Sequence, residues 1–222
     1  MKQTIHLHEL FNFLSKQGFY TSNEIYSKFE KYLSLIRSWS KRTNLISKND
    51  IDFVVEKHFL PSIFLFSEIK NNNHKKILDI GSGGGFPGIV LMIMNSDFMI
   101  TLLDSSHKKC MFLKELSETI EINCDVICMR VEDYINESDE KYDITVSRAV
   151  SKLSSLWEWS GPLLKNDGLL YALKGGNCLK EINVLTQRPI STEIIYPGKK
   201  WIEFSKYLKT KFIVRARCNK LK

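Results

Sequence analysis

An apolar strand that runs directly into a glycine-dense turn is the feature that most restricts the fold of this chain. Residues 77–80 read Ile-Leu-Asp-Ile, glycines follow at positions 81, 83, 84, 85 and 88, and Pro87 precedes an apolar run over 88–94. Glycines allow positive φ angles and let a ligand approach the backbone where a Cβ atom would block it. A strand, a glycine turn and a helix in this order place a ligand at the carboxyl end of a parallel sheet. We therefore expect an α/β protein that binds a ligand at this turn.

Short apolar runs alternate with helical patterns through the chain after residue 75. The runs predict strands over 76–80, 99–104, 125–129, 143–147 and 169–174, and the patterns between them predict helices over 88–94, 107–119 and 152–164. Two further strands are expected over 192–196 and 212–217, the second of them as a half-exposed antiparallel edge strand. This alternation predicts a mostly parallel, seven-stranded Rossmann-like sheet with helices on both faces.

The first seventy residues have a helical pattern instead. Thr21 and Glu24 fit a capping box at the start of a second helix, and Asp50 is placed to cap a third. Pro61 is expected to interrupt the pattern. Apolar side chains recur at intervals of three and four, as at Leu7, Leu10, Phe11 and Leu14. We interpret residues 1–74 as an N-terminal helical extension that packs on an α/β domain formed by residues 75–222.

The composition is that of a globular protein with one α/β domain and a small appendage. The 222 residues are 43% hydrophobic and 26% charged, and no apolar run approaches the ~18 residues of a membrane span. The N-terminus lacks the apolar core of a signal peptide. The five cysteines are scattered, and no histidine stands at metal-ligand spacing beside Cys124 and Cys128. We expect reduced thiols, no metal, no membrane attachment and a cytoplasmic location.

Positive charge is concentrated at the end of the chain. Residues 199–222 hold nine Lys and Arg against one Glu, whereas residues 75–198 hold thirteen against seventeen acidic residues. A basic cluster of this kind is typical of a surface that binds a polyanion such as RNA, but a solvated lysine-rich edge has the same composition. An exposed aromatic ring between the charges could stack on an unpaired base. The candidates are Trp201, Phe204, Tyr207 and Phe212.

The spacing within the glycine turn distinguishes between cofactors. Dinucleotide-binding turns follow G-x-G-x-x-G or G-x-G-x-x-A, whereas this chain has Phe86 at the last of these positions. Asp79 precedes the first glycine by two residues, and its carboxylate suits the ammonium and sulfonium groups of S-adenosylmethionine but would repel a pyrophosphate. We therefore predict S-adenosylmethionine as the ligand, with Gly83 leaving space for it. Asp104, after the second strand, is placed to accept from the ribose hydroxyls, and residues 129–133 change from apolar to acidic, as is typical of an adenine pocket.

The residues after the fourth strand restrict the reaction. Ser-Arg-Ala-Val at 147–150 replaces the Asn/Asp-Pro-Pro-aromatic turn of many enzymes that methylate exocyclic amines, and no cysteine has the Pro-Cys context of pyrimidine C5 methylation. Both observations fit a ring nitrogen with a free lone pair, such as guanine N7, methylated through proximity, orientation and electrostatics. We predict Arg148 as the catalytic residue, holding the cofactor carboxylate or donating to guanine O6. A structural pairing of Arg148 with a carboxylate such as Asp79 is the alternative.

Two further basic side chains have two interpretations each. His58 lies on an apolar helical face, so it is either a structural histidine or one that approaches the site. Lys174 follows the fifth expected strand, so it either reaches a phosphate or caps the strand end.

Several short segments carry a resemblance to a known family. They are residues 44–46, 57–62, 79–88, 102–105, 147–149 and 171–175. In these segments the chain resembles the glucose-inhibited division protein B family, whose members are bacterial methyltransferases that modify N7 of a guanosine in the decoding-region loop of 16S ribosomal RNA. Gly84 and Val150 depart from the residues common in that family, and the resemblance does not extend beyond Gly176.

This resemblance implies a class I Rossmann-like methyltransferase fold and 16S ribosomal RNA, or the small ribosomal subunit, as the partner. It also implies S-adenosylmethionine contacts at Gly81, Phe86, Asp104, Val131, Glu132 and Arg148. We further expect a monomer.

Three other functions fit parts of the sequence. A small-molecule methyltransferase would use the same cofactor, but steep inhibition by salt together with RNA-only substrates would exclude it. A nicotinamide-dependent dehydrogenase is disfavoured by Phe86 and Asp79. A non-catalytic RNA-binding module with the same fold would transfer no methyl group to ribosomal RNA.

Overall fold

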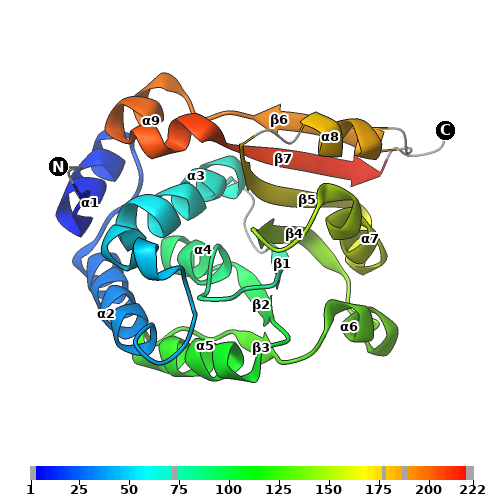
Figure 1. Cartoon of the computed structure of the whole chain (residues 1–222), viewed down its shortest axis with the longest axis horizontal. Helices are drawn as coiled ribbons and strands as arrows, with labels where there is room; N and C mark the ends of the chain where they lie inside the picture. The colour runs from blue at the N-terminus through cyan, green and yellow to red at the C-terminus, as the bar shows by residue number, and fades with distance from the viewer. Residues whose placement is uncertain (1–3, 72–74, 177–178, 187–189, 219–222) are drawn as a thin grey trace.

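The sheet has the predicted Rossmann-like order. The computed structural model describes residues 4–71, 75–176, 179–186 and 190–218, and within these ranges seven strands pair in the order β3-β2-β1-β4-β5-β7-β6 (Figure 1). Strands β1 to β5 are parallel, and β7 pairs antiparallel with both β5 and β6. The strands are β1 (Lys76–Ile80), β2 (Met99–Leu103), β3 (Asp125–Ile127), β4 (Tyr142–Arg148), β5 (Leu164–Gly175), β6 (Ile190–Ile195) and β7 (Lys211–Cys218).

Helices cover both faces of this sheet. Helices α1 to α5 lie on one side of it, and α6 to α8 lie on the other (Figure 1). The helices are α1 (Leu7–Lys16), α2 (Asn23–Trp39), α3 (Leu60–Ile69), α4 (Gly88–Met94), α5 (His107–Thr119), α6 (Val131–Glu137), α7 (Leu153–Leu163), α8 (Leu179–Thr186) and α9 (Lys199–Phe204). The described ranges also contain three short helical turns, namely η1 (Lys48–Phe53), the π-helical η2 (Val55–Phe59) and η3 (Lys206–Thr210).

Burial on both faces explains why the strands are almost continuously apolar. Ile77 of β1 packs into the large core shared with the N-terminal helices, whereas its neighbour Leu78 packs into a separate cluster with Tyr134 and Leu163. Successive residues of a strand point to opposite faces, so a sheet with two covered faces needs apolar residues at both.

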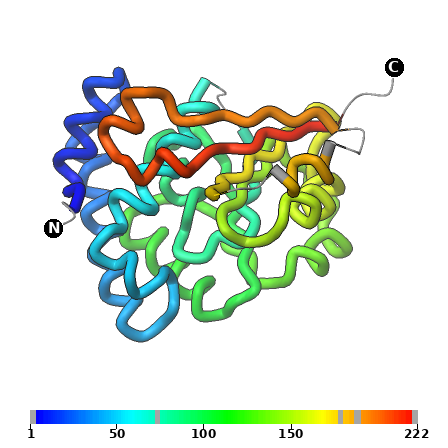
Figure 2. The backbone as a smooth tube through the Cα atoms, turned by 45° about the horizontal axis from the view of Figure 1, so that its top comes forward, coloured from blue at the N-terminus to red at the C-terminus, as the bar shows by residue number. Residues whose placement is uncertain are grey.

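The N-terminal helices pack against the sheet domain and against the C-terminal segment. The Tyr32 hydroxyl of α2 donates to the carbonyl oxygen of Gly84 at 2.6 Å. Phe13 of α1 stacks on Phe204 of α9 with ring centroids 4.2 Å apart and meets Trp201 edge to face. Helices α1 and α9 accordingly lie side by side in both views of the chain (Figure 1, Figure 2). These contacts show that the N-terminal helices pack on the rest of the chain. The division into an extension, 1–74, and a domain, 75–222, stays a prediction.

The antiparallel strand near the C-terminus is not the edge strand that its alternating pattern predicts. Strand β7 lies between β5 and β6, so β6 forms the edge. Ile213 and Val214 are consecutive and both fully buried. The prediction was wrong because β6 pairs with the outer side of β7, although the alternating sequence of β7 is typical of a half-exposed edge strand.

Three predicted signals in the N-terminal region were also wrong. Ser22, one residue after Thr21, caps α2 by accepting from the Ile25 N–H. Asp50 caps no helix but lies within η1, where its carboxylate contacts Lys57. Pro61 does not interrupt the helical pattern, because it lies in the first turn of α3, where its missing N–H is not needed.

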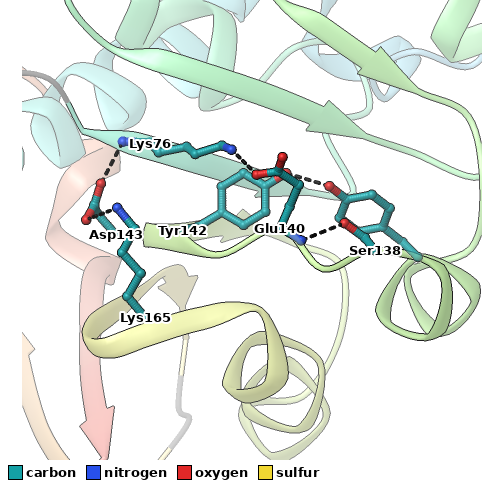
Figure 3. A network of polar contacts seen from close by, with 7 residues as sticks. Lys76, Ser138, Glu140, Tyr142, Asp143 and Lys165 are labelled. Atoms are coloured by element: carbon teal, nitrogen blue, oxygen red, sulfur yellow. Dashed lines mark hydrogen bonds and ion pairs between the residues drawn. The ribbon is translucent and has the colours of Figure 1, made fainter.

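A polar network ties the amino ends of the central strands together (Figure 3). Asp143 of β4 accepts from the backbone N–H of Lys76 at 2.9 Å and from the Lys165 ammonium at 2.8 Å. Burial alone would raise the pKa of Asp143, but these hydrogen bonds lower it below its ordinary value. The network lies at the end of the sheet opposite the carboxyl ends of the strands, so it stabilises the scaffold without contributing to the site.

Candidate active site

A cavity of about 450 Å³ opens at the carboxyl ends of β1, β2 and β4. Small-molecule sites span roughly 300–1,000 Å³, so its size suits a nucleoside-sized ligand. Most of the predicted site residues line it, namely Gly81, Gly83, Phe86, Asp104, Val131, Glu132 and Arg148. The predicted residue Asp79 is not part of this lining.

The glycine turn needs glycine for two different reasons. Gly81 and Gly83 have φ angles of 72° and 57°, which side chains rarely adopt. A Cβ atom at Gly81 would stand 2.5 Å from Val150 Cγ2, whereas one at Gly83 would meet only the Gly81 oxygen, at 3.8 Å. Gly81 therefore permits packing against the β4 loop, and Gly83 leaves the cavity itself open.

Asp79 lies beneath the turn and supports it. Its Oδ2 accepts from the Gly88 N–H at 2.8 Å, and a Cβ atom at Gly88 would stand 2.7 Å from this oxygen. Burial raises the pKa of Asp79 to about 7, although the hydrogen bonds from Gly88 and Ser82 act in the opposite direction. The carboxylate thus joins β1 to the start of α4. A direct contact of Asp79 with a cofactor stays a prediction that this geometry does not test.

Asp104 connects the second strand to the glycine turn. Its Oδ2 accepts from the Gly83 N–H at 2.9 Å, and its Oδ1 accepts from the Ser106 N–H at 2.9 Å. Lys109, in the first turn of α5, brings its ammonium to 3.5 Å from Oδ2 and also lines the cavity. Each carboxylate oxygen has further acceptor capacity, so Asp104 is still able to accept from a ligand.

Arg148 is half-buried, and one of its two terminal guanidinium nitrogens has no partner in the part of the chain that the structure describes. Nη2 donates to the Lys57 carbonyl oxygen at 2.8 Å, whereas Nη1 is buried and has no hydrogen-bond partner among the described residues. Burial lowers the pKa of Arg148, and its Cζ atom lies 5.7 Å from the Phe86 ring centroid. The hydrogen bond goes to a backbone carbonyl and not to the Asp79 carboxylate. A buried, unpaired donor in a cavity wall is the kind of group that a ligand satisfies.

His58 belongs to the cavity wall as well. The centroids of the His58 and Phe86 rings are 4.9 Å apart. His58 Nε2 lies 3.4 Å from Asp50 Oδ2 without forming a hydrogen bond. Burial and the neighbouring Arg148 lower the pKa of His58 to about 3. Of the two interpretations of His58, the structure therefore shows the one in which it reaches the site, as a neutral imidazole.

Other residues of the site had no signal in the sequence. Lys109 and Trp159 line the cavity, but each is placed there by a helix whose packing depends on distant residues. Lys174 lines a neighbouring cavity, where its ammonium donates to the Ser151 carbonyl at 2.7 Å and to Glu181 Oε2 at 3.0 Å. These contacts are those of a strand-end cap, one of its two interpretations.

Neither a metal-binding cluster nor a membrane-spanning helix is present in the described ranges. They contain no group of three or more His, Cys, Asp and Glu side chains that could hold a metal ion. None of the helices in these ranges is long and apolar enough to cross a membrane.

Solved structures of methyltransferases share this fold. The putative caffeoyl-CoA O-methyltransferase from Staphylococcus aureus has a TM-score of 0.60 at 14% identity and matches 95% of this chain and 98% of its own. The O-methyltransferase from Bacillus cereus, solved in complex with SAH, has a TM-score of 0.60 at 14% identity and matches 94% of this chain and 96% of its own. These likenesses confirm the class I Rossmann-like fold.

The sequence comparisons identify the family. The family model GidB, rRNA small subunit methyltransferase G, matches residues 25–198. The ribosomal RNA small subunit methyltransferase G of Clostridium botulinum is 38% identical over 73% of this chain and 69% of its own length. That of Clostridium perfringens is 35% identical over 75% of this chain and 71% of its own. The resemblance noted in the short segments is confirmed, and the chain belongs to the rRNA small subunit methyltransferase G family.

Proposed function

We propose that this enzyme transfers a methyl group from S-adenosylmethionine to N7 of a guanosine in the decoding-region loop of 16S ribosomal RNA. Membership of the rRNA small subunit methyltransferase G family supports ribosomal RNA as the substrate. The observation that carries the rest is the cavity itself. It combines the open space above Gly83, the Asp104 carboxylate and the unpaired Nη1 of Arg148.

The donor set of this cavity fits S-adenosylmethionine. Asp104 accepts from the ribose hydroxyls, Arg148 Nη1 pairs with the methionine carboxylate, and Val131 and Glu132 hold the adenine. Cations pair well with carboxylates, and carboxylates accept strongly from hydroxyls. Asp79 acts from beneath the turn by fixing the start of α4.

The chemistry needs no general base from this chain. S-adenosylmethionine supplies a methyl group on a sulfonium centre, and guanine N7 attacks with a lone pair and loses no proton. The neutral His58 beside Phe86 is therefore not required to accept one. Arg148 acts by orientation and charge: the two hydrogens on Nη1 suffice for the cofactor carboxylate and for guanine O6, and a donor to N7 itself would block the attack.

We also propose that the enzyme acts as a cytoplasmic monomer that binds the RNA of the small subunit. Three of the described cysteines are free thiols, namely Cys110, Cys124 and Cys128. Free thiols are typical of a reducing compartment, which supports the cytoplasmic location. Sedimentation of the purified protein would test the monomeric state.

Methyl transfer to RNA tests the proposal against its rivals. The protein is incubated with labelled S-adenosylmethionine and, separately, unmethylated 16S ribosomal RNA, transfer RNA or a panel of small-molecule hydroxyl and amine acceptors. We expect label in the 16S RNA alone, with activity falling steeply as salt rises, because counterion release weakens RNA binding. Label in the small molecules, or no transfer to any RNA, would contradict the proposal.

A further inference from the structure

A second cavity adjoins the first and shares a wall with it. It has a volume of about 350 Å³ and lies where β5 ends and β7 begins. Arg148 and Ala149 line both cavities. Ala149 has a φ angle of 55°, a conformation that non-glycine residues adopt rarely, so the backbone of this shared wall is held in an unusual shape by its surroundings.

Positive charge exceeds negative charge in the second cavity. Lys174 and Glu181 form an ion pair at 3.0 Å and cancel each other. Arg148 and Lys211 have no carboxylate partner within salt-bridge distance in the described ranges. Two uncompensated cations therefore face this space, which favours an anionic ligand.

The second cavity also presents an aromatic ring. Tyr207 of η3 lines it, and the Lys211 ammonium lies 4.5 Å from the centroid of the Tyr207 ring. A Cβ atom at Gly175 would stand 2.8 Å from Lys211 Nζ, so the glycine makes room for the lysine beside the ring. An aromatic ring beside a cation that has no carboxylate partner is the combination that binds an unstacked base together with its phosphate.

Among the aromatic residues of the basic C-terminal segment, Tyr207 differs from the other three. Trp201 and Phe204 pack on Phe13 of α1, and Phe212 is buried in a hydrophobic cluster. Tyr207 instead lines a cavity, at the same carboxyl end of the sheet as the glycine turn. Lys211 pairs across to Gly175 at the carboxyl end of β5, which places the start of β7 beside the second cavity.

We propose that the second cavity receives the guanosine nucleotide to be methylated, unstacked from the RNA strand, with its base against Tyr207 and its phosphate at Lys211. This inference rests on the proposed function. Enzymes that modify a base commonly take it out of the stack into a pocket. The shared wall brings such a base next to Arg148, which lines both cavities and has an unpaired Nη1.

Substitutions at Tyr207 and Lys211 test the inference. The variants are Tyr207→Ala, Tyr207→Phe and Lys211→Gln, with Lys165→Gln at the opposite end of the sheet as the matched control. Cofactor affinity is measured by calorimetry with S-adenosylhomocysteine, folding by thermal melting, and methyl transfer to unmethylated 16S RNA at several salt concentrations.

We expect all four variants to bind S-adenosylhomocysteine like the parent protein. Tyr207→Ala should raise the KM for RNA, or lower the single-turnover rate, by about tenfold or more, because stacking contributes that order of affinity. Tyr207→Phe keeps the ring and should lose little. Lys211→Gln should make the salt dependence of RNA binding shallower by about 0.7, the slope of one single-strand phosphate contact.

The outcomes separate this inference from the proposed function. If the parent protein transfers no methyl group to RNA, the proposed function fails and the assignment of the second cavity fails with it. If the parent is active and Tyr207→Ala and Lys211→Gln behave like Lys165→Gln, the proposed function stands and the second cavity is not the nucleotide site. Weaker S-adenosylhomocysteine binding in folded Tyr207→Ala would equally overturn the inference, because it would assign Tyr207 to the cofactor.

Discussion

The Asp104 carboxylate accepts a hydrogen bond from the Gly83 N–H at 2.9 Å, so the end of β2 holds the glycine turn that follows β1. The same carboxylate lines the cavity and is the proposed acceptor for the ribose hydroxyls. One side chain thus shapes the turn and binds the ligand, and substitutions that separate these two roles are informative.

Replacing Asp104 should weaken S-adenosylmethionine binding to an extent that depends on the substitution. Asp104→Ala removes both the charge and the acceptor for Gly83, so we expect a loss of roughly 1–3 kcal/mol in calorimetry. Asp104→Asn keeps one acceptor oxygen and should lose less. The exposed Asp97, in the loop before β2, gives the control Asp97→Ala. Unchanged affinity in Asp104→Ala would refute the ribose assignment.

Gly83→Val should abolish cofactor binding while the protein stays folded. The branched side chain would project into space that is open in this structure. Gly18 offers a matched control, because it has a similar φ angle of 76° and also has open space around its Cβ position, but lies between α1 and α2. Gly83→Val and Gly18→Val carry the same kind of backbone strain, of about 1–2 kcal/mol. Cofactor binding that is retained in Gly83→Val would show that the turn is only structural.

Asp79→Asn should change how stability depends on pH. Burial raises the pKa of Asp79 to about 7 in the folded protein, whereas an unfolded Asp titrates near 3.9, so the folded chain keeps a proton that the unfolded chain releases in this window. The stability contributed by Asp79 is therefore full below about pH 4 and is lost as the pH rises to about 7.

The stability of Asp79→Asn relative to the parent protein is measured by urea unfolding at pH 5, 6, 7 and 8. We expect the free energy of unfolding of the variant, relative to that of the parent, to rise by about 2–3 kcal/mol between pH 5 and pH 8. For Asp97→Asn, at an exposed position, the free energy of unfolding should depend on pH in the same way as that of the parent. A constant difference between Asp79→Asn and the parent would mean that Asp79 is ionised throughout.

The stacked pair Phe13 and Phe204 should couple the N-terminal extension to the C-terminal segment energetically. Their ring centroids are 4.2 Å apart, so each alanine substitution should destabilise the protein. A double-mutant cycle should give a coupling energy of roughly 0.5–1.5 kcal/mol. Additive effects would show that α1 and α9 touch without depending on each other.

The elements that sequence patterns predicted best are those with strong local signals. Helices α4 and α5 begin and end at the predicted residues, because an apolar or amphipathic run between glycine, serine and turn residues determines both ends. Helix α6 was missed, since it has only seven residues, is separated from β3 by three residues and buries a single side chain, that of Tyr134. The edge position of β6 was not predictable from the sequence of β6 or of β7, because it depends on β7 pairing with β5 as well as with β6.

In the candidate site, too, the residues with local signals were predictable and the long-range contacts were not. Asp104 and Gly83 follow strands that are recognisable in the sequence, and Arg148 ends another, so the parallel sheet alone brings them to its carboxyl end. The partner of Arg148 is the carbonyl of Lys57, 91 residues earlier in the chain. Such long-range contacts depend on how the N-terminal helices dock, and no local pattern encodes them.

Mapping the methylated atom tests the central claim most directly. Unmethylated 16S ribosomal RNA is incubated with the enzyme and S-adenosylmethionine, treated with borohydride and aniline, which cleave the strand at N7-methylguanosine, and read by primer extension. We predict a new cleavage at a single guanosine in the decoding-region loop that appears only with both enzyme and cofactor. Methyl label in the RNA without such a cleavage, or no label in the RNA at all, would contradict the account.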